Sequence, residues 1–286
     1  GKDVFAHFGS VTSNIDLWVN GKYVGYSEDS KLAAEFDLTS YIKPGAKNLF
    51  AFQVFRWCDG SYLEDQDFWR LSGVARDSYL YARTKNRIED IRVQPDLDEN
   101  YKGGSLGITA QIKGKGQVAF RLLDAEGGEV ANASAAAKPE VKLEFALDNP
   151  KLWSAEIPYL YTLEAEFGGE KISSQVGFRK VEIKNSQLLV NGQPVLIKGA
   201  DRHELDPDGG YVISHERMEQ DIKIMKQFNL NAVRTCHYPD DPYWYELCDR
   251  EGIYVVCEAN LECQGAGYNT NSLSLNPLFR NTHIER

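Results

Sequence analysis

In the first part of the chain, apolar and polar positions alternate, which is the period of a strand with one buried face. Residues 15–19 follow this pattern, and Asn20-Gly21 directly after them is a typical hairpin turn. A second alternating run covers residues 49–54 and follows a Lys-Pro-Gly turn. Short strands with such turns and no helical periodicity predict an all-β sandwich for residues 1–83.

The second part keeps the period of two but differs in composition. Alternating apolar positions recur at residues 106–112, 118–122, 141–145 and 160–167. Strands at this spacing within about 100 residues are typical of an immunoglobulin-like sandwich, although the usual Cys…Trp…Cys signature is missing. We therefore assign residues 84–180 to an immunoglobulin-like β-sandwich.

From residue 181 the hydrophobic pattern changes, and it predicts strands and helices in alternation. The apolar run 195–197 predicts a short buried strand, and residues 231–234 and 253–256 predict two more. Two predicted helices separate these strands. The first is capped by Ser214, ends at Asn229 and carries apolar residues at helical spacing, namely Met218, Ile222, Met225 and Phe228. The second runs from Asp241-Pro242 to Gly252. This order indicates parallel βαβ units.

Polar residues follow each of these predicted strands. They are Asp201-Arg202-His203-Glu204, then Cys236-His237-Tyr238-Pro239, then Glu258-Ala259-Asn260-Leu261-Glu262. In a (β/α)₈ barrel the carboxyl ends of the strands form the active-site face. The pattern therefore predicts a catalytic face, and ordinary turns at strand ends are the alternative reading.

Composition excludes some classes of partner. The formal net charge of -10 repels phosphate backbones, so we expect no nucleic acid partner. No apolar run approaches the ~20 residues that span a bilayer, so we expect no membrane partner. The five cysteines are odd in number and lack a C-x-x-C pair, which indicates buried or free thiols. Few cysteines suit a cytoplasmic or a bacterial periplasmic protein, and the start at Gly1 leaves a targeting segment open.

Several motifs resemble glycoside hydrolase family 2. The loop at residues 59–73, DGSYLEDQDFWRLSG, is closely similar to that of the family's bacterial β-galactosidases. Residues 20–38 resemble the family's sugar-binding domain, and residues 149–161 resemble its middle domain. The match continues toward and into the barrel through Gly177-Phe178-Arg179, Lys198-Gly199, Arg202-His203-Glu204, His237-Tyr238-Pro239 and Glu258-Ala259-Asn260.

The resemblance implies a fold and an activity. The fold would be a jelly-roll-like sugar-binding sandwich (1–83), an immunoglobulin-like sandwich (84–180) and the first part of a TIM-barrel catalytic domain (181–286). The activity would be retaining hydrolysis of terminal β-D-galactosyl residues, with a β-galactoside such as lactose as substrate. A homo-oligomer is expected for the complete enzyme.

Retaining hydrolysis needs two carboxyl groups about 5–5.5 Å apart. In the family both are glutamates on later barrel strands, and one belongs to an Asn-Glu pair. No Asn-Glu follows Glu262, so both are expected beyond Arg286. We expect the chain by itself to be inactive and marginally soluble.

The resemblance also implies site residues. Asp67 matches an aspartate that contacts galactose and a bound Na⁺, and His203 and His237 match histidines that hydrogen-bond sugar hydroxyls. Glu262 matches a Mg²⁺ ligand, but Gln264 stands where the family has a ligating histidine, so Mg²⁺ binding is expected to be weak. Thr12 stands where the family often has an asparagine that faces the sugar.

Two other interpretations remain open. The related β-glucuronidases and β-mannosidases share the domain order, and the match at residues 64–73 favours galactose over their substrates. A non-catalytic carbohydrate-binding protein would explain residues 1–180 but not the motifs after Lys198.

Overall fold

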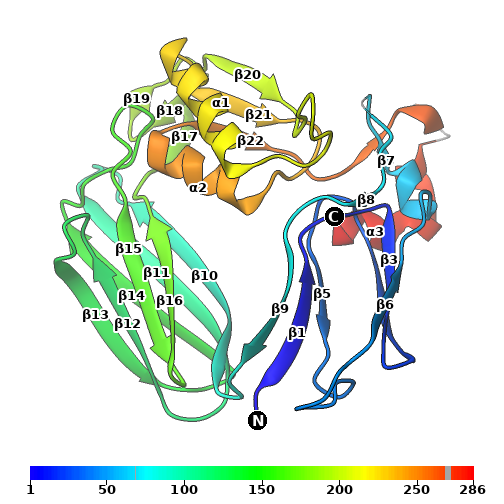
Figure 1. The fold of residues 1–286 in the computed structure, drawn as a ribbon. Helices are drawn as coiled ribbons and strands as arrows, with labels where there is room; N and C mark the ends of the chain where they lie inside the picture. The colour runs from blue at the N-terminus through cyan, green and yellow to red at the C-terminus, as the bar shows by residue number, and fades with distance from the viewer. Residues whose placement is uncertain (68, 268–271) are drawn as a thin grey trace. The chain divides into compact units, whose positions relative to one another are not determined.

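The computed structural model describes residues 1–67, 69–267 and 272–286. Phe68, which belongs to the loop that resembles β-galactosidases, lies outside the described residues. The chain forms two compact units, each built from segments distant in sequence (Figure 1). The first unit comprises residues 1–2, 83–198 and 246–254, and the second comprises residues 3–82, 199–245 and 255–286.

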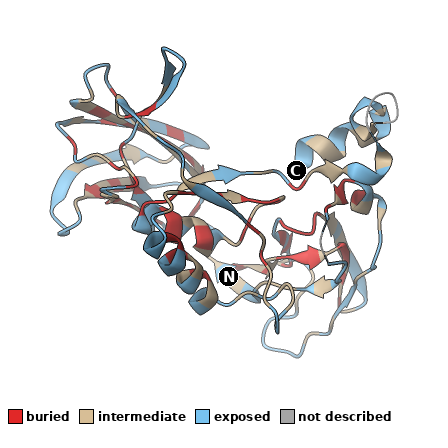
Figure 2. Cartoon of the chain, turned by 90° about the horizontal axis from the view of Figure 1, so that it is seen from above, coloured by how far each residue is buried: buried red, intermediate tan, exposed pale blue. Residues whose placement is uncertain are grey.

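The first unit contains two antiparallel sheets that share a hydrophobic core. One has the order β10 (Arg87–Leu97), β11 (Gly103–Lys113) and β14 (Glu140–Asp148). The other has the order β13 (Glu129–Ala136), β12 (Gln117–Leu123), β15 (Tyr161–Phe167) and β16 (Glu170–Val176). The predicted alternation is confirmed, because Leu106 and Ile108 of β11 and Phe120 and Leu122 of β12 are buried. Buried positions are red in Figure 2.

A small antiparallel sheet completes the first unit. It consists of β17 (Val181–Lys184), β18 (Gln187–Val190) and β19 (Gln193–Pro194). The predicted buried strand at residues 195–197 is wrong, because no strand covers these residues and Leu196 and Ile197 are 76% and 48% exposed. An apolar run forms a strand only where its backbone pairs with a neighbouring strand. In this part of the chain the pairing begins at Gly199, which pairs with Ala232.

The second unit begins with two three-stranded sheets around a second core. Their orders are β5 (Ala34–Asp37), β1 (Asp3–Phe8), β9 (Ser78–Arg83) and β4 (Lys22–Glu28), β3 (Asn14–Val19), β6 (Phe50–Gln53). The predicted hairpin is confirmed, because Asn20 and Gly21 both have positive φ and join β3 to β4. Ile15, Leu17 and Val19 are buried in the core.

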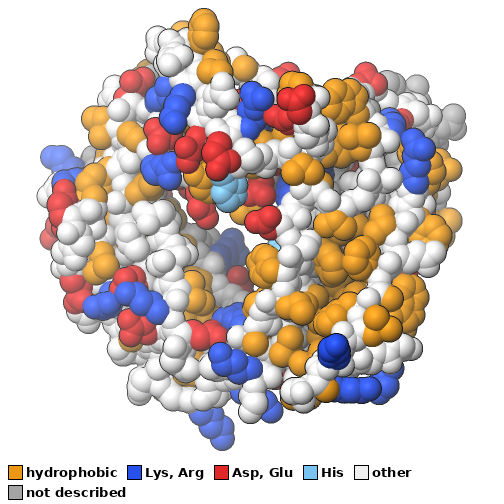
Figure 3. Space-filling model, in the orientation of Figure 1, with side chains coloured by type: hydrophobic (Ala, Val, Ile, Leu, Met, Phe, Trp, Pro, Cys, Tyr) orange, Lys and Arg blue, Asp and Glu red, His pale blue; other side chains and the backbone are white. Residues whose placement is uncertain are grey.

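Two short pairs and several short helices complete this part of the second unit. β2 (Val11–Thr12) pairs with β8 (Gly73–Val74), and β7 (Glu64–Asp65) pairs in parallel with β23 (Glu262–Cys263). The short helices are η1 (Asp59–Tyr62), η2 (Gln264–Ala266), η4 (Leu273–Leu275), η5 (Pro277–Phe279) and α3 (Arg280–Glu285). Hydrophobic side chains gather on the surface over β3, β5 and β6 (Figure 3).

The alternating strands and helices begin at residue 199; most of them belong to the second unit, but residues 246–254 belong to the first. β20 (Gly199–Arg202) pairs in parallel with β21 (Ala232–Thr235), and β22 (Tyr254–Cys257) follows β21 in the sheet. Helix α1 (His215–Gln227) connects β20 to β21, and α2 (Pro242–Glu251) connects β21 to β22. Among the described residues, no helix is long and apolar enough to cross a membrane.

The two helices confirm their sequence signals, with one exception. The Ser214 hydroxyl accepts a hydrogen bond from the Arg217 amide and caps α1. Met218, Ile222 and Met225 are buried, but Phe228 is 75% exposed, because α1 ends before it. In the third strand the expected burial is also only partial, since Val256 is 55% exposed.

Candidate functional site

Two histidines lie side by side at the carboxyl ends of adjacent parallel strands. Arg202 of β20 is paired with Thr235 of β21, so His203 and Cys236 leave the sheet at the same level. The rings of His203 and His237 are 5.3 Å apart between centroids and meet edge to face at 73°. The structure thus brings together the two histidines predicted from sequence.

Two carboxylates from the segment after β22 lie beside His237. Its Nδ1 lies 3.4 Å from Glu258 Oε2 and 3.8 Å from Glu262 Oε2. The Arg234 guanidinium lies 3.0 Å from the same nitrogen and pairs with Glu258. Because Arg234 neutralises Glu258, the less compensated carboxylate beside His237 is that of Glu262.

One carboxylate oxygen of the partly buried Glu262 has no hydrogen-bond partner among the described residues. This oxygen, Oε2, is itself buried. Buried carboxylate oxygens normally have a partner, so an orphaned one is a mark of a missing ligand. The second predicted metal-binding residue differs, because Gln264 is exposed at the start of η2.

Asp67, the third predicted sugar ligand, is exposed. No hydrogen bond or ion pair joins it to another described residue. Its neighbour Gln66 is anchored, because the Gln66 amide donates to Asn260 Oδ1 at 2.8 Å and Asn260 donates to Asp29 Oδ1 at 2.8 Å. The loop that carries Asp67 is therefore tied to the segment that follows β22.

A small cavity lies beside this anchor. It has a volume of about 50 Å³, and its lining includes Lys31, Gln66, Trp69, Tyr211 and Asn260. Thr12 also lines the cavity, so it lies close to the loop that carries Asp67. The sequence did not assign a role to Thr12. Aromatic and amide groups together offer both an apolar surface and hydrogen bonds to a polar ligand.

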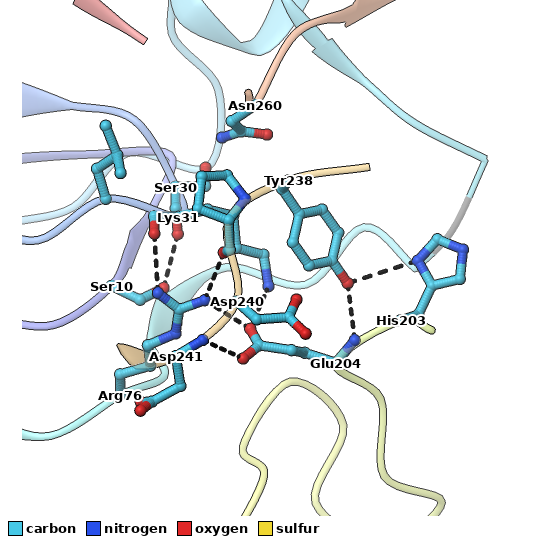
Figure 4. Close-up of polar contacts among 12 residues, drawn as sticks. Ser10, Ser30, Lys31, Arg76, His203, Glu204, Tyr238, Asp240, Asp241 and Asn260 are labelled. Carbon is cyan, nitrogen blue, oxygen red and sulfur yellow. Dashed lines mark hydrogen bonds and ion pairs between the residues drawn. The ribbon is translucent and has the colours of Figure 1, made fainter. Parts of the chain in front are cut away.

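A buried network of charged groups lies next to His203 (Figure 4). Glu204 Oε2 is 2.6 Å from Arg76 Nη2 and 3.4 Å from Lys31 Nζ, and all three side chains are at most 9% exposed. Glu204 Oε1 accepts a hydrogen bond from the Asp241 amide at 2.7 Å. Burial raises the pKa of Glu204, but Lys31 and Arg76 outweigh this effect and hold the pKa below its ordinary value.

Tyr238 connects this network to His203. Its hydroxyl accepts a hydrogen bond from the Glu204 amide at 3.0 Å and lies 3.5 Å from His203 Nδ1. The Lys31 ammonium lies over the Tyr238 ring at 4.0 Å from its centroid. Burial, the His237 ring and Lys31 together lower the pKa of His203, which favours the neutral imidazole.

Asp240 is a second buried acid in the network. It pairs with Arg202 at 2.7 Å, and its other oxygen, Oδ1, finds no hydrogen-bond partner in the described ranges. Burial and the nearby Glu204 carboxylate raise the pKa of Asp240 to about 7.

The sequence assigned no role to Lys31, Arg76, Asp240 or Tyr238, all of which belong to the buried network. Tyr238 and Glu204 did lie within motifs at predicted strand ends. Lys31 and Arg76 carry no signal of their own, because lysine and arginine are rarely fully buried and their shared partner Glu204 lies more than 120 residues away.

Family models match consecutive parts of the chain. The sugar binding domain of glycosyl hydrolases family 2 matches residues 2–84, the family 2 model matches residues 86–179, and the family's TIM barrel domain matches residues 181–286.

Individual relatives agree with these matches. A β-galactosidase of Photobacterium profundum is 45% identical, over 98% of this chain and 29% of that protein, and one of Vibrio cholerae gives the same values. The chain thus spans about 29% of the length of these curated relatives.

Among solved structures, a β-glucuronidase of Ruminococcus gnavus has a TM-score of 0.82 and 26% identity, over 91% of this chain and 47% of that chain. A Faecalibacterium prausnitzii β-glucuronidase has a TM-score of 0.80 and 29% identity, over 91% and 48%. With β-sandwich sheets followed by the opening strands and helices of a barrel, and with three consecutive matches, the chain belongs to glycoside hydrolase family 2.

Proposed function

We propose that this chain is part of a β-galactosidase that hydrolyses terminal β-D-galactosyl residues with retention. The observation that carries the proposal is the pair of strand-end imidazoles, His203 and His237, beside the carboxylates of Glu258 and Glu262. The 45% identity to β-galactosidases supports galactose as the sugar.

The histidines are proposed to bind sugar hydroxyls. A neutral imidazole has one donor and one acceptor, and a hydroxyl can use both. The buried network supports this role, because Tyr238 contacts His203 and is itself held by the Glu204 amide. A ring held in this way loses less conformational freedom when the sugar binds.

Asp67 is proposed as a further sugar ligand, since an exposed carboxylate accepts hydrogen bonds from hydroxyls. It would also ligate Na⁺, which prefers oxygen ligands. The acid/base and the nucleophile are not assigned to any residue of this chain. The finer fold assignments, jelly-roll-like for residues 1–83 and immunoglobulin-like for residues 84–180, are part of the same proposal.

Magnesium is proposed to bind weakly at Glu262. The orphaned Oε2 atom fits a hard cation, whereas the exposed, neutral Gln264 adds little. When bound, the ion would supply positive charge beside the site. Calorimetric titration with Mg²⁺ should give a dissociation constant well above micromolar, and sub-micromolar affinity would contradict this proposal.

β-Glucuronidase is the second candidate, because the solved structures named above carry that activity in their titles. The test uses a full-length family 2 enzyme that contains residues 1–286, assayed on nitrophenyl β-galactoside and nitrophenyl β-glucuronide. We expect a higher kcat/KM on the galactoside. Faster turnover of the glucuronide would refute the assignment to galactose.

A further inference from the structure

Three potential metal ligands of different chemistry meet at the ends of β20 and β21. A ring nitrogen of His203, the sulfur of Cys236 and a ring nitrogen of His237 all lie within 4.8 Å of one another. Cys236 is 2% exposed, and both histidines are half-buried. The pairing of β20 with β21 produces this arrangement, because it brings His203 level with Cys236 although the two are 33 positions apart.

The distances suit a tetrahedral ion. With bonds of about 2.0–2.3 Å, the ligands of a tetrahedral Zn²⁺ lie roughly 3.5 Å apart. Groups that lie up to 4.8 Å apart would therefore have to approach one another by at most about 1.3 Å. This movement is small enough for side-chain rotation, with the strands left in place.

Glu262 provides a second, independent observation. Its buried Oε2 atom has no hydrogen-bond partner within the described residues and lies 3.8 Å from His237 Nδ1. Metal-bound histidines almost always direct their other ring nitrogen at a carboxylate, a carbonyl or water. Glu262 stands where such a carboxylate is needed.

Two contacts oppose a cation at this place. The Arg234 guanidinium lies 3.0 Å from His237 Nδ1, and the Cys236 thiol donates a hydrogen bond to the Arg202 carbonyl at 3.4 Å. Arg234 is already paired with Glu258 and Asp201, so its charge is compensated, and the weak thiol hydrogen bond is given up when Cys236 loses its proton.

We propose that His203, Cys236 and His237 form a binding site for a thiophilic divalent transition metal, with Zn²⁺ as the ion of best fit. The combination of two imidazoles and one thiolate is typical of zinc sites with three protein ligands and an open fourth position. Cys236 would release its proton to solvent when the metal binds. Mg²⁺ prefers oxygen ligands, so it would not bind the two imidazoles or the thiolate.

Metal binding would have a consequence for the sugar site. The ion would occupy the imidazole nitrogens to which we assign sugar hydroxyls, so Zn²⁺ and galactoside would compete. This consequence rests on the proposed function, whereas the metal site itself does not.

The test is titration of the purified, reduced chain with Co²⁺, a coloured substitute for Zn²⁺. A thiolate ligand gives an intense sulfur-to-cobalt charge-transfer band in the near ultraviolet, and added Zn²⁺ should remove it. We expect this band in the wild type with one equivalent of Co²⁺. It should be absent in Cys236→Ser, and His203→Gln should weaken Co²⁺ affinity by about tenfold or more.

The matched control is Cys58→Ser. Cys58 lies in the other cluster of possible ligands, with Glu28 and Asp59, and its loss should leave the band unchanged. The proposal is overturned if the wild type shows no band, if the band persists in Cys236→Ser, or if only Cys58→Ser removes it. None of these readouts needs enzymatic activity, so they stay separate from the assay of the proposed function. His203→Gln tests the site even if Cys236→Ser fails to fold.

Discussion

His203 shows how surroundings decide the chemistry of one side chain. Lys31 and the ring of His237 both disfavour a positive charge on it, and partial burial acts in the same direction. The neutral imidazole keeps an acceptor nitrogen, which an imidazolium lacks. Accepting a hydrogen bond from a sugar hydroxyl and coordinating a metal both need that nitrogen.

Replacement of His203 by alanine tests its role in sugar binding. In a full-length family 2 enzyme containing this chain, His203→Ala should lower kcat/KM on a nitrophenyl galactoside by about 100-fold, an order of magnitude typical of a lost transition-state hydrogen bond. His215→Ala, which removes an exposed histidine at the start of α1, is the control and should leave kcat/KM unchanged. Equal effects of the two variants would contradict the assignment.

Asp240 should make stability depend on pH. Its pKa is raised from 3.8 to about 7 in the folded chain, so between these values the folded state binds more protons than the unfolded state. The contribution of Asp240 to the unfolding free energy should therefore fall as pH rises from about 4 to about 7, and stay constant above that range.

Asp240→Asn isolates this contribution, because asparagine does not ionise. The measurement is urea unfolding of both proteins across the same pH range. The stability of the wild type relative to the variant should decline with rising pH. A difference that stays constant, or that grows, would contradict the raised pKa.

The pairing of β20 with β21 positions the two histidines, and Gly199 allows the two strands to approach each other closely. A Cβ atom at residue 199 would meet the carbonyl oxygen of Ala232 at 3.0 Å and its Cβ at 3.1 Å. Both contacts are too tight for a larger side chain without movement of a strand. Glycine is thus needed here for space.

Gly199→Val should separate the two strands and cost about 1–3 kcal/mol of stability. It should also weaken Co²⁺ binding, because His203 would no longer stand level with Cys236. Gly107→Val is the matched control, since a Cβ in the middle of β11 meets its nearest atom only at 3.7 Å. Thermal unfolding compares the two, and similar losses in both would argue against a special role of Gly199.

At the scale of the molecule, Glu204 joins distant parts of the second unit. Lys31 follows β4, Arg76 follows β8, and Glu204 follows β20, so one carboxylate connects the sandwich to the parallel strands. All three groups are buried, and removal of one charge leaves the others uncompensated.

Glu204→Gln should therefore destabilise the chain by about 3 kcal/mol, seen as a lower urea midpoint. Glu140→Gln removes a carboxylate from an exposed pair with Lys142 and should leave the midpoint unchanged. A Glu204→Gln midpoint equal to that of the wild type would mean that the network does not hold these parts together.

Much of this architecture could be predicted from local pattern. The Asn20-Gly21 turn, the Ser214 cap and the alternation around Leu106 each depend on neighbouring residues alone, and each is confirmed. The strand at residues 195–197 failed, because a strand also needs a partner, and the partner pairs from Gly199 onward.

Local pattern was enough to predict most strands and helices, the family motifs and the two histidines at strand ends, because periodicity and motif spacing are properties of adjacent residues. The surroundings of those histidines depend on the folded chain. The contacts of Glu204 with Lys31 and Arg76, the Glu262 oxygen without a partner among the described residues, and the meeting of Cys236 with both rings arise from segments far apart in the chain. Such contacts set the charge state of the site, and they exist only once the strands have paired.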